Sequence, residues 1–308
     1  MSIRYLAYKD IDKKKWDACI RESFNGLIYA EAVYLDHMSP GWDAIVLNDY
    51  EVVMPLTWRR KWNIKYLYQP AFIQQGGIFS KYKISPDLLN SFINEAFKEF
   101  RFAEITLNHE NTSIPRSKEL KLTLRNNYIL QLGSGYQTIF KKYNSYIRQR
   151  LNRLKKFSLQ YVQSNDCAEA VKLYRKLYNG RMTSLSAKDY SQFEQLCAHY
   201  VKEGRVVIRK VFSVDGKELL ALIMLLKDER RLYNMVSCIL PQGKKLLANY
   251  FLYNELIREF AGVNVILDFE GSDIPGVSYF YNKFAGGNQQ YPFLKFNRLP
   301  LPVRFLKR

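Results

Sequence analysis

The sequence has 308 residues, of which 47% are hydrophobic and 15% aromatic. This length suits two domains of ordinary size, and the apolar content is enough to bury a core in each, so we expect a globular chain. The formal net charge of +18 favours anionic partners, for which nucleic acid, phosphorylated cofactors and acidic membrane surfaces all qualify. A basic surface that serves only solubility is the alternative.

Sparse cysteine and histidine exclude several kinds of site. The four cysteines stand far apart without a C-x-x-C pair, which argues against a zinc site and against a disulfide framework. Three histidines leave little for a serine triad or a His-rich site, so we expect no metal. The N-terminus lacks the apolar core of a signal peptide, and no apolar run reaches membrane length. We therefore expect a cytoplasmic protein with no integral membrane segment, for which peripheral membrane contact stays open.

Residues 1–135 are predicted to form an N-terminal domain. Its expected elements are a strand at 3–8, helices at 12–21 and 30–38, a hairpin of WDAIVL and EVVMPLTW around Asn48-Asp49, short strands in YLYQP and IQQGGIF, a helix at 85–101 and a strand in AEITL. This half therefore has the order hairpin, helix, strand.

Residues 139–157 are predicted to form one basic helix at the junction of two domains. Apolar residues recur there at helical spacing, while seven lysines and arginines and no acid share the segment. A solvated helix face generally carries opposite charges at i,i+4 spacing, and this one has none. We therefore predict phosphate contacts by Arg148, Arg150 and Lys155, with a merely solvated face as the alternative.

Residues 136–295 are predicted to form a C-terminal domain, whose pattern is clearest over 206–287. Three strand-like runs, VVIRKVFSV, ELLALIMLLK and RLYNMVSCI, are joined by tight turns and should pair antiparallel. The middle run is apolar without alternation over 219–226, which is typical of a central strand covered on both faces. A loop at 240–244, a helix to Phe260, a short strand in VNVILDF and a last helix through Phe284 follow.

The order strand, strand, strand, helix, strand, helix resembles the second half of the GNAT (N-acetyltransferase) fold. The stretch LDFEGSDIPGVSYFYNKFAGG is similar to the Asp-, Gly- and Phe-rich signature of the Fem-type aminoacyl transferases, which extend peptidoglycan peptides. The strand-end Asp and Gly of that signature correspond to Asp268 and Gly271. Family members often carry Lys directly after the first Phe of the signature, where this chain has Tyr281, and the nearest lysine is Lys283.

The resemblance implies an α/β (α+β) fold of tandem GNAT-like domains, with mixed, mostly antiparallel sheets flanked by helices. It also implies that the cofactor groove of the first domain is degenerate, so that the second domain carries the chemistry. The tail 296–308 is expected to return to the first domain, and a loose basic tail is the alternative.

The GNAT scaffold binds an acyl carbonyl through backbone N–H groups where its fourth and fifth strands separate, which places the carbonyl here near Asn234 and Val236. Transfer to an amine also needs a base for the amine's proton. Asp268 and Glu270 are the best candidates, and being two apart on a strand they should share one face. Capping of the following loop is an equally strong alternative for either carboxylate.

A departing oxygen or sulfur needs a proton donor, for which Tyr233, Tyr279 and Tyr281 are candidates, although in a chain with 23 tyrosines aromatic packing is the stronger explanation for any one of them. The remaining residues expected to contact substrate follow the strand end: Gly271, Ser272, Tyr279 and Lys283.

The loop before the long helix bears on the acyl donor. CoA-dependent GNAT enzymes usually place a glycine-rich loop there, whose bare amides bind the pyrophosphate. This chain offers Gly243 alone, followed by Lys244 and Lys245, which can hold a phosphate backbone by charge. An RNA-borne donor would tolerate that change better than CoA.

Together these features predict a Fem-like transferase that moves an aminoacyl or acyl group to an amine such as a cell-wall peptide precursor, with no tightly bound cofactor. Aminoacyl-tRNA is the favoured donor and tRNA therefore a candidate partner. Acyl-CoA is the alternative donor, because a fold does not fix a function. A non-catalytic anion-binding protein on the same fold is a further alternative, whose ligand binding would survive removal of both candidate carboxylates.

Overall fold

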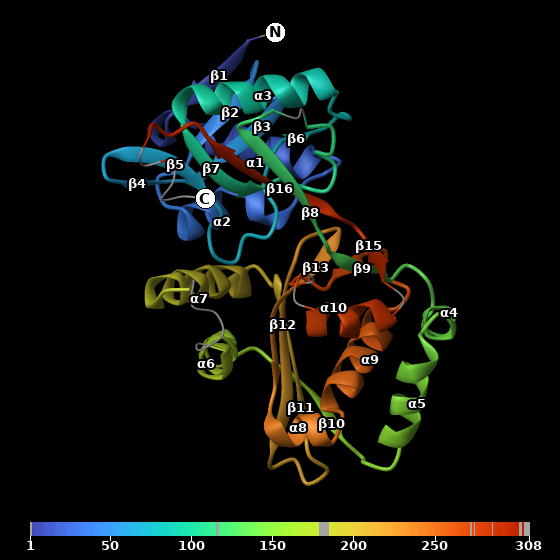
Figure 1. Ribbon diagram of the computed structural model, residues 1–308. Coiled ribbons are helices and arrows are strands. Elements are labelled where there is room, and N and C mark those ends of the chain that lie inside the picture. Colours follow the sequence, from blue (N-terminus) through green and yellow to red (C-terminus); the bar gives the residue numbers. More distant parts are fainter. Residues whose placement is uncertain are drawn as a thin grey trace. The chain divides into compact units, whose positions relative to one another are not determined.

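The computed structural model describes residues 2–114, 117–178, 185–271, 273, 275–284, 286–301 and 304. Its elements fall into two compact units. Met1–Arg125 and Gln290–Arg308 make up the first unit, and Asn126–Gln289 make up the second. Figure 1 labels the elements in chain order. The predicted α/β architecture with mixed, mostly antiparallel sheets flanked by helices is confirmed.

The first unit contains a four-stranded and a five-stranded sheet, in the orders β1-β2-β3-β6 and β4-β5-β7-β16-β8. Helix α3 packs on β1 and β2, whereas α1 packs on β3 and β6. The described elements of this unit are β1 (Ile3–Leu6), η1 (Tyr8–Asp10), α1 (Lys13–Glu22), η2 (Ile28–Ala30), α2 (Ala32–Met38), β2 (Asp43–Leu47), β3 (Val52–Leu56), β4 (Trp58–Lys61), β5 (Ile64–Tyr68), β6 (Phe79–Ser80), α3 (Pro86–Glu99), β7 (Phe102–Thr106), β8 (Leu120–Arg125) and β16 (Tyr291–Asn297).

The second unit is built on a seven-stranded sheet in the order β10-β11-β12-β13-β14-β9-β15. Helices α6 and α7 contact its strands, as does α9, and Figure 1 shows the first two and the last on opposite sides of the sheet. The described elements are β9 (Tyr128–Gln131), α4 (Tyr136–Lys141), α5 (Ser145–Leu154), β10 (Gln160–Ser164), α6 (Cys167–Tyr178), α7 (Ala187–Lys202), β11 (Val206–Phe212), β12 (Leu219–Lys227), β13 (Arg231–Ile239), α8 (Pro241–Lys245), α9 (Ala248–Phe260), β14 (Ile266–Asp268), α10 (Pro275–Tyr281), η3 (Asn282–Phe284) and β15 (Gly287–Asn288).

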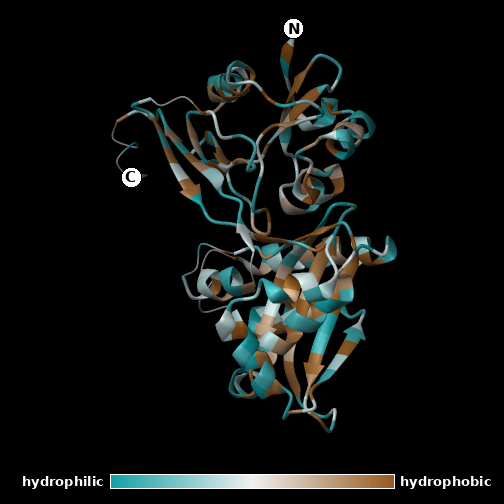
Figure 2. Cartoon of the chain, turned by 90° about the vertical axis from the view of Figure 1, so that its right-hand side faces the viewer, coloured by the Kyte–Doolittle hydropathy of each residue, from teal (hydrophilic) through white to brown (hydrophobic). Residues whose placement is uncertain are grey.

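The three predicted antiparallel strands are β11, β12 and β13, which pair in that order. Strand β12 is buried along nearly its whole length and has a neighbour on each side, as its unbroken apolar run predicts. Figure 2 colours long stretches of these strands brown, the hydrophobic end of its scale. The unit's core forms between this sheet and α9, where Leu252, Leu256 and Ile257 are fully buried.

Two predicted helices are each divided in the structure. The basic segment 139–157 is not one helix, because α4 ends at Lys141 and α5 starts at Ser145. The Asn144 side chain accepts a hydrogen bond from Tyr146 N and so caps the start of α5. The predicted loop 240–244 is mostly helical, because α8 covers Pro241–Lys245. Helix α9 begins only at Ala248, after Leu247, whose φ of 56° is left-handed.

Two strands join the sheets at places that differ from the predicted boundaries. Strand β9 pairs with β14 in the second unit, whereas the sequence analysis assigned its residues to the first domain. Strand β16 lies between β7 and β8, so the chain re-enters the first unit's sheet at Tyr291, before the predicted tail begins at 296. The last basic residues, Lys307 and Arg308, lie outside the described residues.

Candidate active site

Strands β13 and β14 of the second unit separate at the place where the sequence analysis put the acyl carbonyl. They pair in parallel over only three positions, the last of which is Tyr233 with Asp268. Immediately beyond, the register of β13 against β12 shifts, so that Asn234 pairs with Leu225 and Val236 with Met224. Met235 is therefore an extra residue in a β-bulge, a feature that often re-aims backbone and side chains beside active sites.

A buried amide and two phenols meet where these strands separate. Asn234 Nδ2 lies 3.1 Å from the Phe269 carbonyl oxygen, 2.7 Å from Tyr253 Oη and 3.0 Å from Tyr281 Oη. Because a carbonyl oxygen can only accept, the amide nitrogen must face Phe269, and this fixes the orientation of the Asn234 side chain. Its Oδ1 atom is then buried without a hydrogen-bond partner among the described residues.

The two phenols form a chain of hydroxyl groups with a serine. Tyr253 Oη lies 3.1 Å from Tyr281 Oη and 3.2 Å from Ser237 Oγ. Burial raises the pKa of Tyr253 to about 12 and that of Tyr281 well above its ordinary value. Both phenols therefore stay protonated near neutral pH and can donate hydrogen bonds. The half-buried Ser237 gives this chain a more accessible end.

Asp268 lies at the end of β14, but its carboxylate is occupied by structural partners. It accepts hydrogen bonds from Arg231 Nη1 at 2.9 Å, Asn127 Nδ2 at 3.1 Å and Glu270 N at 3.2 Å. Burial raises the pKa of this carboxyl, against the opposing pull of Arg231 and Asn127. The buried ion pair ties β13 to β14, which favours a structural role for Asp268 over that of a free base.

Glu270 and Gly271 follow in left-handed backbone, with φ of 54° and 58°. Strand β14 ends at Asp268, so the continuous strand from which the sequence analysis placed both carboxylates on one face does not extend to Glu270. Glu270 is half-buried and Gly271 exposed at this bend. Ser272 lies outside the described residues.

Lys283 is a buried lysine held by aromatic rings. Its Nζ lies 3.7 Å from the centre of the Tyr146 ring and 3.7 Å from that of Tyr279, and the residue is only 9% exposed. Within the described ranges no carboxylate forms an ion pair with it. Arg150 reaches the same place from α5, where its Nη2 donates to Tyr146 Oη at 2.8 Å. Hydrogen bonds from Tyr250 and Arg150 lower the pKa of Tyr146.

The other cations of α4 and α5 face solvent. Arg148 and Lys155 are exposed, and none of the seven lysines and arginines over 139–157 forms an ion pair with a described carboxylate. Helix α5 lies beside α9 (Figure 1) and also contacts η3, which carries Lys283. The exposed basic face therefore adjoins the Tyr146–Lys283 contact.

Gly243 is needed for packing. A Cβ atom at this position would lie 2.0 Å from the Leu220 carbonyl oxygen, so glycine is what allows α8 to pack on β12. Three backbone amides of this segment are already bonded within the chain, since Lys244 N donates to Leu240 O, Leu246 N to Gln242 O and Leu247 N to Lys244 O. The side chains of Lys244 and Lys245 are exposed.

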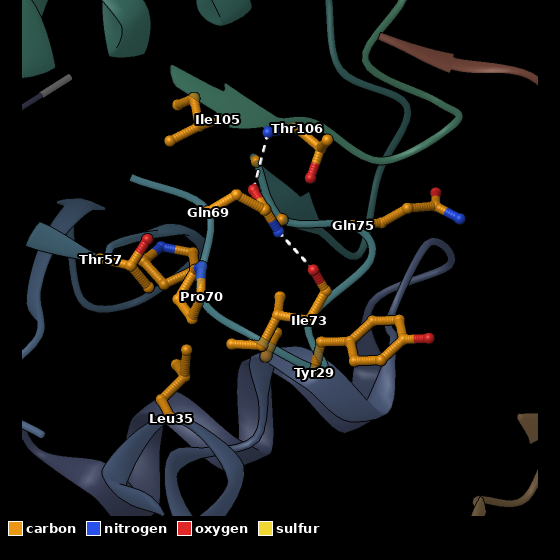
Figure 3. A pocket seen from close by; sticks show the side chains of 13 residues that line it. Tyr29, Leu35, Thr57, Gln69, Pro70, Ile73, Gln75, Ile105 and Thr106 are labelled. Carbon is orange, nitrogen blue, oxygen red and sulfur yellow. Dashed lines mark hydrogen bonds between the residues drawn. The ribbon is translucent and has the colours of Figure 1, made fainter. Parts of the chain in front are cut away.

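The first unit has its own pair of separating parallel strands, β5 and β7, beside a small pocket. Figure 3 shows the Gln69 side chain bridging this gap. Gln69 Oε1 accepts from Thr106 N at 2.8 Å and Gln69 Nε2 donates to the Ile73 carbonyl oxygen at 2.5 Å. The Thr106 backbone amide is therefore already used within the first unit.

Sequence reasoning missed Tyr253, Ser237, Asn127 and Arg231. Tyr253 lies on the apolar face of the long helix, so its position predicts a core residue. The other three residues form their hydrogen bonds with residues that are distant in the sequence. For Arg231 the partner is 37 positions away. Among the described residues no cluster of three or more His, Cys, Asp or Glu side chains could hold a metal ion. Every helix described is too short or too polar to cross a bilayer.

Comparison with known proteins agrees with this geometry. Residues 141–273 match the family model described as "Acetyltransferase (GNAT) domain". No curated protein sequence matches the chain significantly. The structure of FemX is similar over 100% of both chains, with a TM-score of 0.65 and 12% identity.

Two further solved structures share the fold. A conserved protein of unknown function from Bacteroides thetaiotaomicron is 11% identical, with a TM-score of 0.59 over 96% of this chain and 100% of that one. L-PGS from Bacillus licheniformis is 12% identical, with a TM-score of 0.53 over 96% of this chain and 95% of that one. Identities this low establish a shared fold and nothing finer.

Proposed function

We propose, from the premise that the chain is a transferase of the GNAT superfamily with the Fem-type fold, that it moves an aminoacyl group from aminoacyl-tRNA to an amine. The amine nitrogen attacks the ester carbonyl, a C–N bond forms and the ester C–O bond breaks. The amine loses a proton, and the departing ribose oxygen gains one. A cell-wall peptide precursor is the acceptor class that the Fem-type likeness suggests.

The groups at the separation of β13 and β14 suit these proton movements. Tyr281 can protonate the departing oxygen and regain a proton from Tyr253, which in turn borders Ser237. The unpartnered Oδ1 of Asn234 can accept a hydrogen bond from an amine of the substrate. Backbone N–H groups at the Met235 bulge would donate hydrogen bonds to the developing oxyanion and so stabilise it. Glu270, rather than the ion-paired Asp268, is then the candidate to take the amine's proton.

One observation carries the choice of donor, namely the basic face of α4 and α5 without acidic partners. Exposed cations such as Arg148 can bind RNA phosphates. Arg150 and the buried Lys283, both over the Tyr146 ring, place further positive charge close to Tyr281, which is two positions before Lys283 in the sequence. Three backbone amides around α8 are already bonded within the chain, which weakens the case for a CoA pyrophosphate site there. Lys244 and Lys245, which are exposed on α8 itself, add positive charge there.

Acyl-CoA remains the second candidate donor, because the matched family model is that of an acetyltransferase domain. Transfer from a thioester would use the same phenols, with sulfur as the departing atom.

Reversing three cations on α5 tests the donor assignment. The triple variant Arg148→Glu, Arg153→Glu, Lys155→Glu should bind tRNA more weakly and with a flatter salt dependence. Each lost phosphate contact removes about 0.7–0.9 from the slope of log K against log salt, so the slope should fall by about 2–3 in all. Filter binding or anisotropy over a salt series measures this.

The matched control reverses three exposed lysines of the first unit, Lys14→Glu, Lys83→Glu and Lys118→Glu. It makes the same change in net charge. An equal loss of slope in both triple variants would mean that RNA binding follows overall charge and not the basic face of α4 and α5.

A further inference from the structure

The β4–β5 hairpin of the first unit has a tryptophan, Trp62, at a turn position where the backbone geometry disfavours a bulky residue. Strands β4 and β5 pair antiparallel up to Lys61 with Ile64, which leaves a two-residue turn of Trp62 and Asn63. Both turn residues have positive φ, 48° and 60°, as in a type I′ turn. Such turns favour Asn and Gly, and a bulky residue with positive φ is strained. Trp62 is nevertheless at the tip, with 66% of its surface exposed.

The same hairpin is strongly basic. Residues 58–68 contain four cations and no acid, and Arg59, Arg60 and Lys61 are consecutive and exposed. Arg60 and Lys61 form no ion pair with a described carboxylate. Three of the four cations lie over ring faces, at 4.0 Å for Arg59 over Tyr68, 4.1 Å for Lys65 over Trp58 and 4.9 Å for Lys61 over Trp62.

Protection of a sheet edge explains part of this pattern. Strand β4 is the edge of the five-stranded sheet, and lysine or arginine on an edge discourages pairing with another chain. That role requires the cations of β4. It does not require an exposed indole in a strained position beyond the strand.

We propose that the β4–β5 hairpin is a peripheral membrane contact, in which Trp62 enters the lipid interface while Arg60 and Lys61 bind anionic headgroups. Indole rings favour the boundary between water and acyl chains, and cations near an anionic leaflet are attracted to it. RNA would instead need open ring faces for base stacking, and the rings of Trp58, Trp62 and Tyr68 each already carry a cation of the hairpin on one face. This contact is independent of the acyl donor.

The distribution of tryptophan makes the proposal measurable by intrinsic fluorescence. The chain has four tryptophans, of which Trp16 and Trp42 are fully buried and Trp58 is half-buried under Lys65. Trp62 is thus the exposed reporter. Adding phosphatidylcholine vesicles that contain phosphatidylglycerol to the full chain should shift its emission to the blue, and phosphatidylcholine alone should shift it little.

Two sets of variants separate lipid contact from general charge. Trp62→Asn keeps a residue suited to positive φ, so it should fold with an unlowered unfolding midpoint, lose the blue shift and bind vesicles about tenfold more weakly. Arg60→Glu with Lys61→Glu should weaken vesicle binding by about fivefold or more for each residue. The control Lys83→Glu with Lys118→Glu makes the same charge change outside the hairpin and should have a smaller effect.

The proposal is overturned if vesicles with phosphatidylglycerol produce no blue shift, or if the control pair weakens binding as much as the hairpin pair. A blue shift that polyuridylate produces and vesicles do not would assign the hairpin to RNA instead.

Discussion

Replacing Arg231 with methionine is expected to lower the free energy of unfolding by about 3–5 kcal/mol, because the change leaves a buried carboxylate without its charge partner. Arg231 and Asp268 are 7% and 1% exposed at their side chains and lie 2.9 Å apart. Water cannot replace the lost guanidinium at a site this closed. Urea denaturation of the variant and the wild type measures the loss.

The pH dependence of this loss provides a second signature. Burial already raises the pKa of Asp268, so this group contributes most to stability below the unfolded carboxyl pKa of about 3.9 and less as pH rises through its folded pKa. Without Arg231 the folded pKa rises further. The destabilisation should therefore be larger at about pH 7 than at about pH 5, where the isolated carboxyl takes up a proton more readily.

The control is Arg298→Met, which breaks an ion pair with Glu119 whose side chains are 60% and 35% exposed. Exposed pairs contribute about 0–1 kcal/mol, so this variant should be close to wild type. If Arg231→Met costs no more than the control at any pH, the Arg231–Asp268 pair does not hold β13 and β14 together.

Replacing Tyr281 with phenylalanine should lower kcat by about 10²–10³-fold, the usual effect of removing a positioned proton donor or oxyanion donor. The ring remains to fill its place against Phe269, where the two rings stack at 4.7 Å, so folding should be preserved. Tyr253→Phe should act in the same direction, because it interrupts the hydroxyl chain to Ser237. Amide product formed from aminoacyl-tRNA and a peptide precursor, detected by mass spectrometry, gives the rate.

Tyr143→Phe is the matched control for the loss of a buried phenol oxygen. Tyr143 is in the same core, its hydroxyl has no hydrogen-bond partner among the described residues, and its ring contacts Phe284. It should retain wild-type kcat. An unchanged kcat in Tyr281→Phe, with the control also unchanged, would remove Tyr281 from the proposed chemistry.

Local patterns were sufficient to predict the regular part of this fold. The strand-like runs and tight turns over 206–239 predict β11, β12 and β13. The helices predicted from 12 and from 85 are α1 and α3, which begin directly after caps at Asp12 and Ser85. Each of these features depends on residues within a few positions of one another. The likeness of the last third to the Fem-type signature similarly rests on a contiguous stretch.

Features that depend on distant residues could not be predicted. In the sequence Asn234 is a single polar residue within a strand. It becomes the centre of a hydrogen-bonded cluster because the fold brings Tyr253 of α9 and Tyr281 of α10 next to it. The sequence predicts Asp268 as a candidate base because its partners Arg231 and Asn127 are far from it along the chain and cannot be identified there. The divided helices have a different cause, since a cap at Asn144 and a left-handed Leu247 override a continuous helical spacing.

The most direct test of the donor assignment compares a charged tRNA with acetyl-CoA by calorimetric titration of the same protein at low salt. Each charge-assisted hydrogen bond missing from a pyrophosphate site costs about 1.5–3 kcal/mol, so acetyl-CoA should bind with a Kd of about 10⁻⁴ M or weaker, near −5 kcal/mol. Charged tRNA should bind more tightly, with an affinity that falls steeply as salt rises. Sub-micromolar binding of acetyl-CoA with saturable acetyl transfer to an amine would contradict the account and make acyl-CoA the donor.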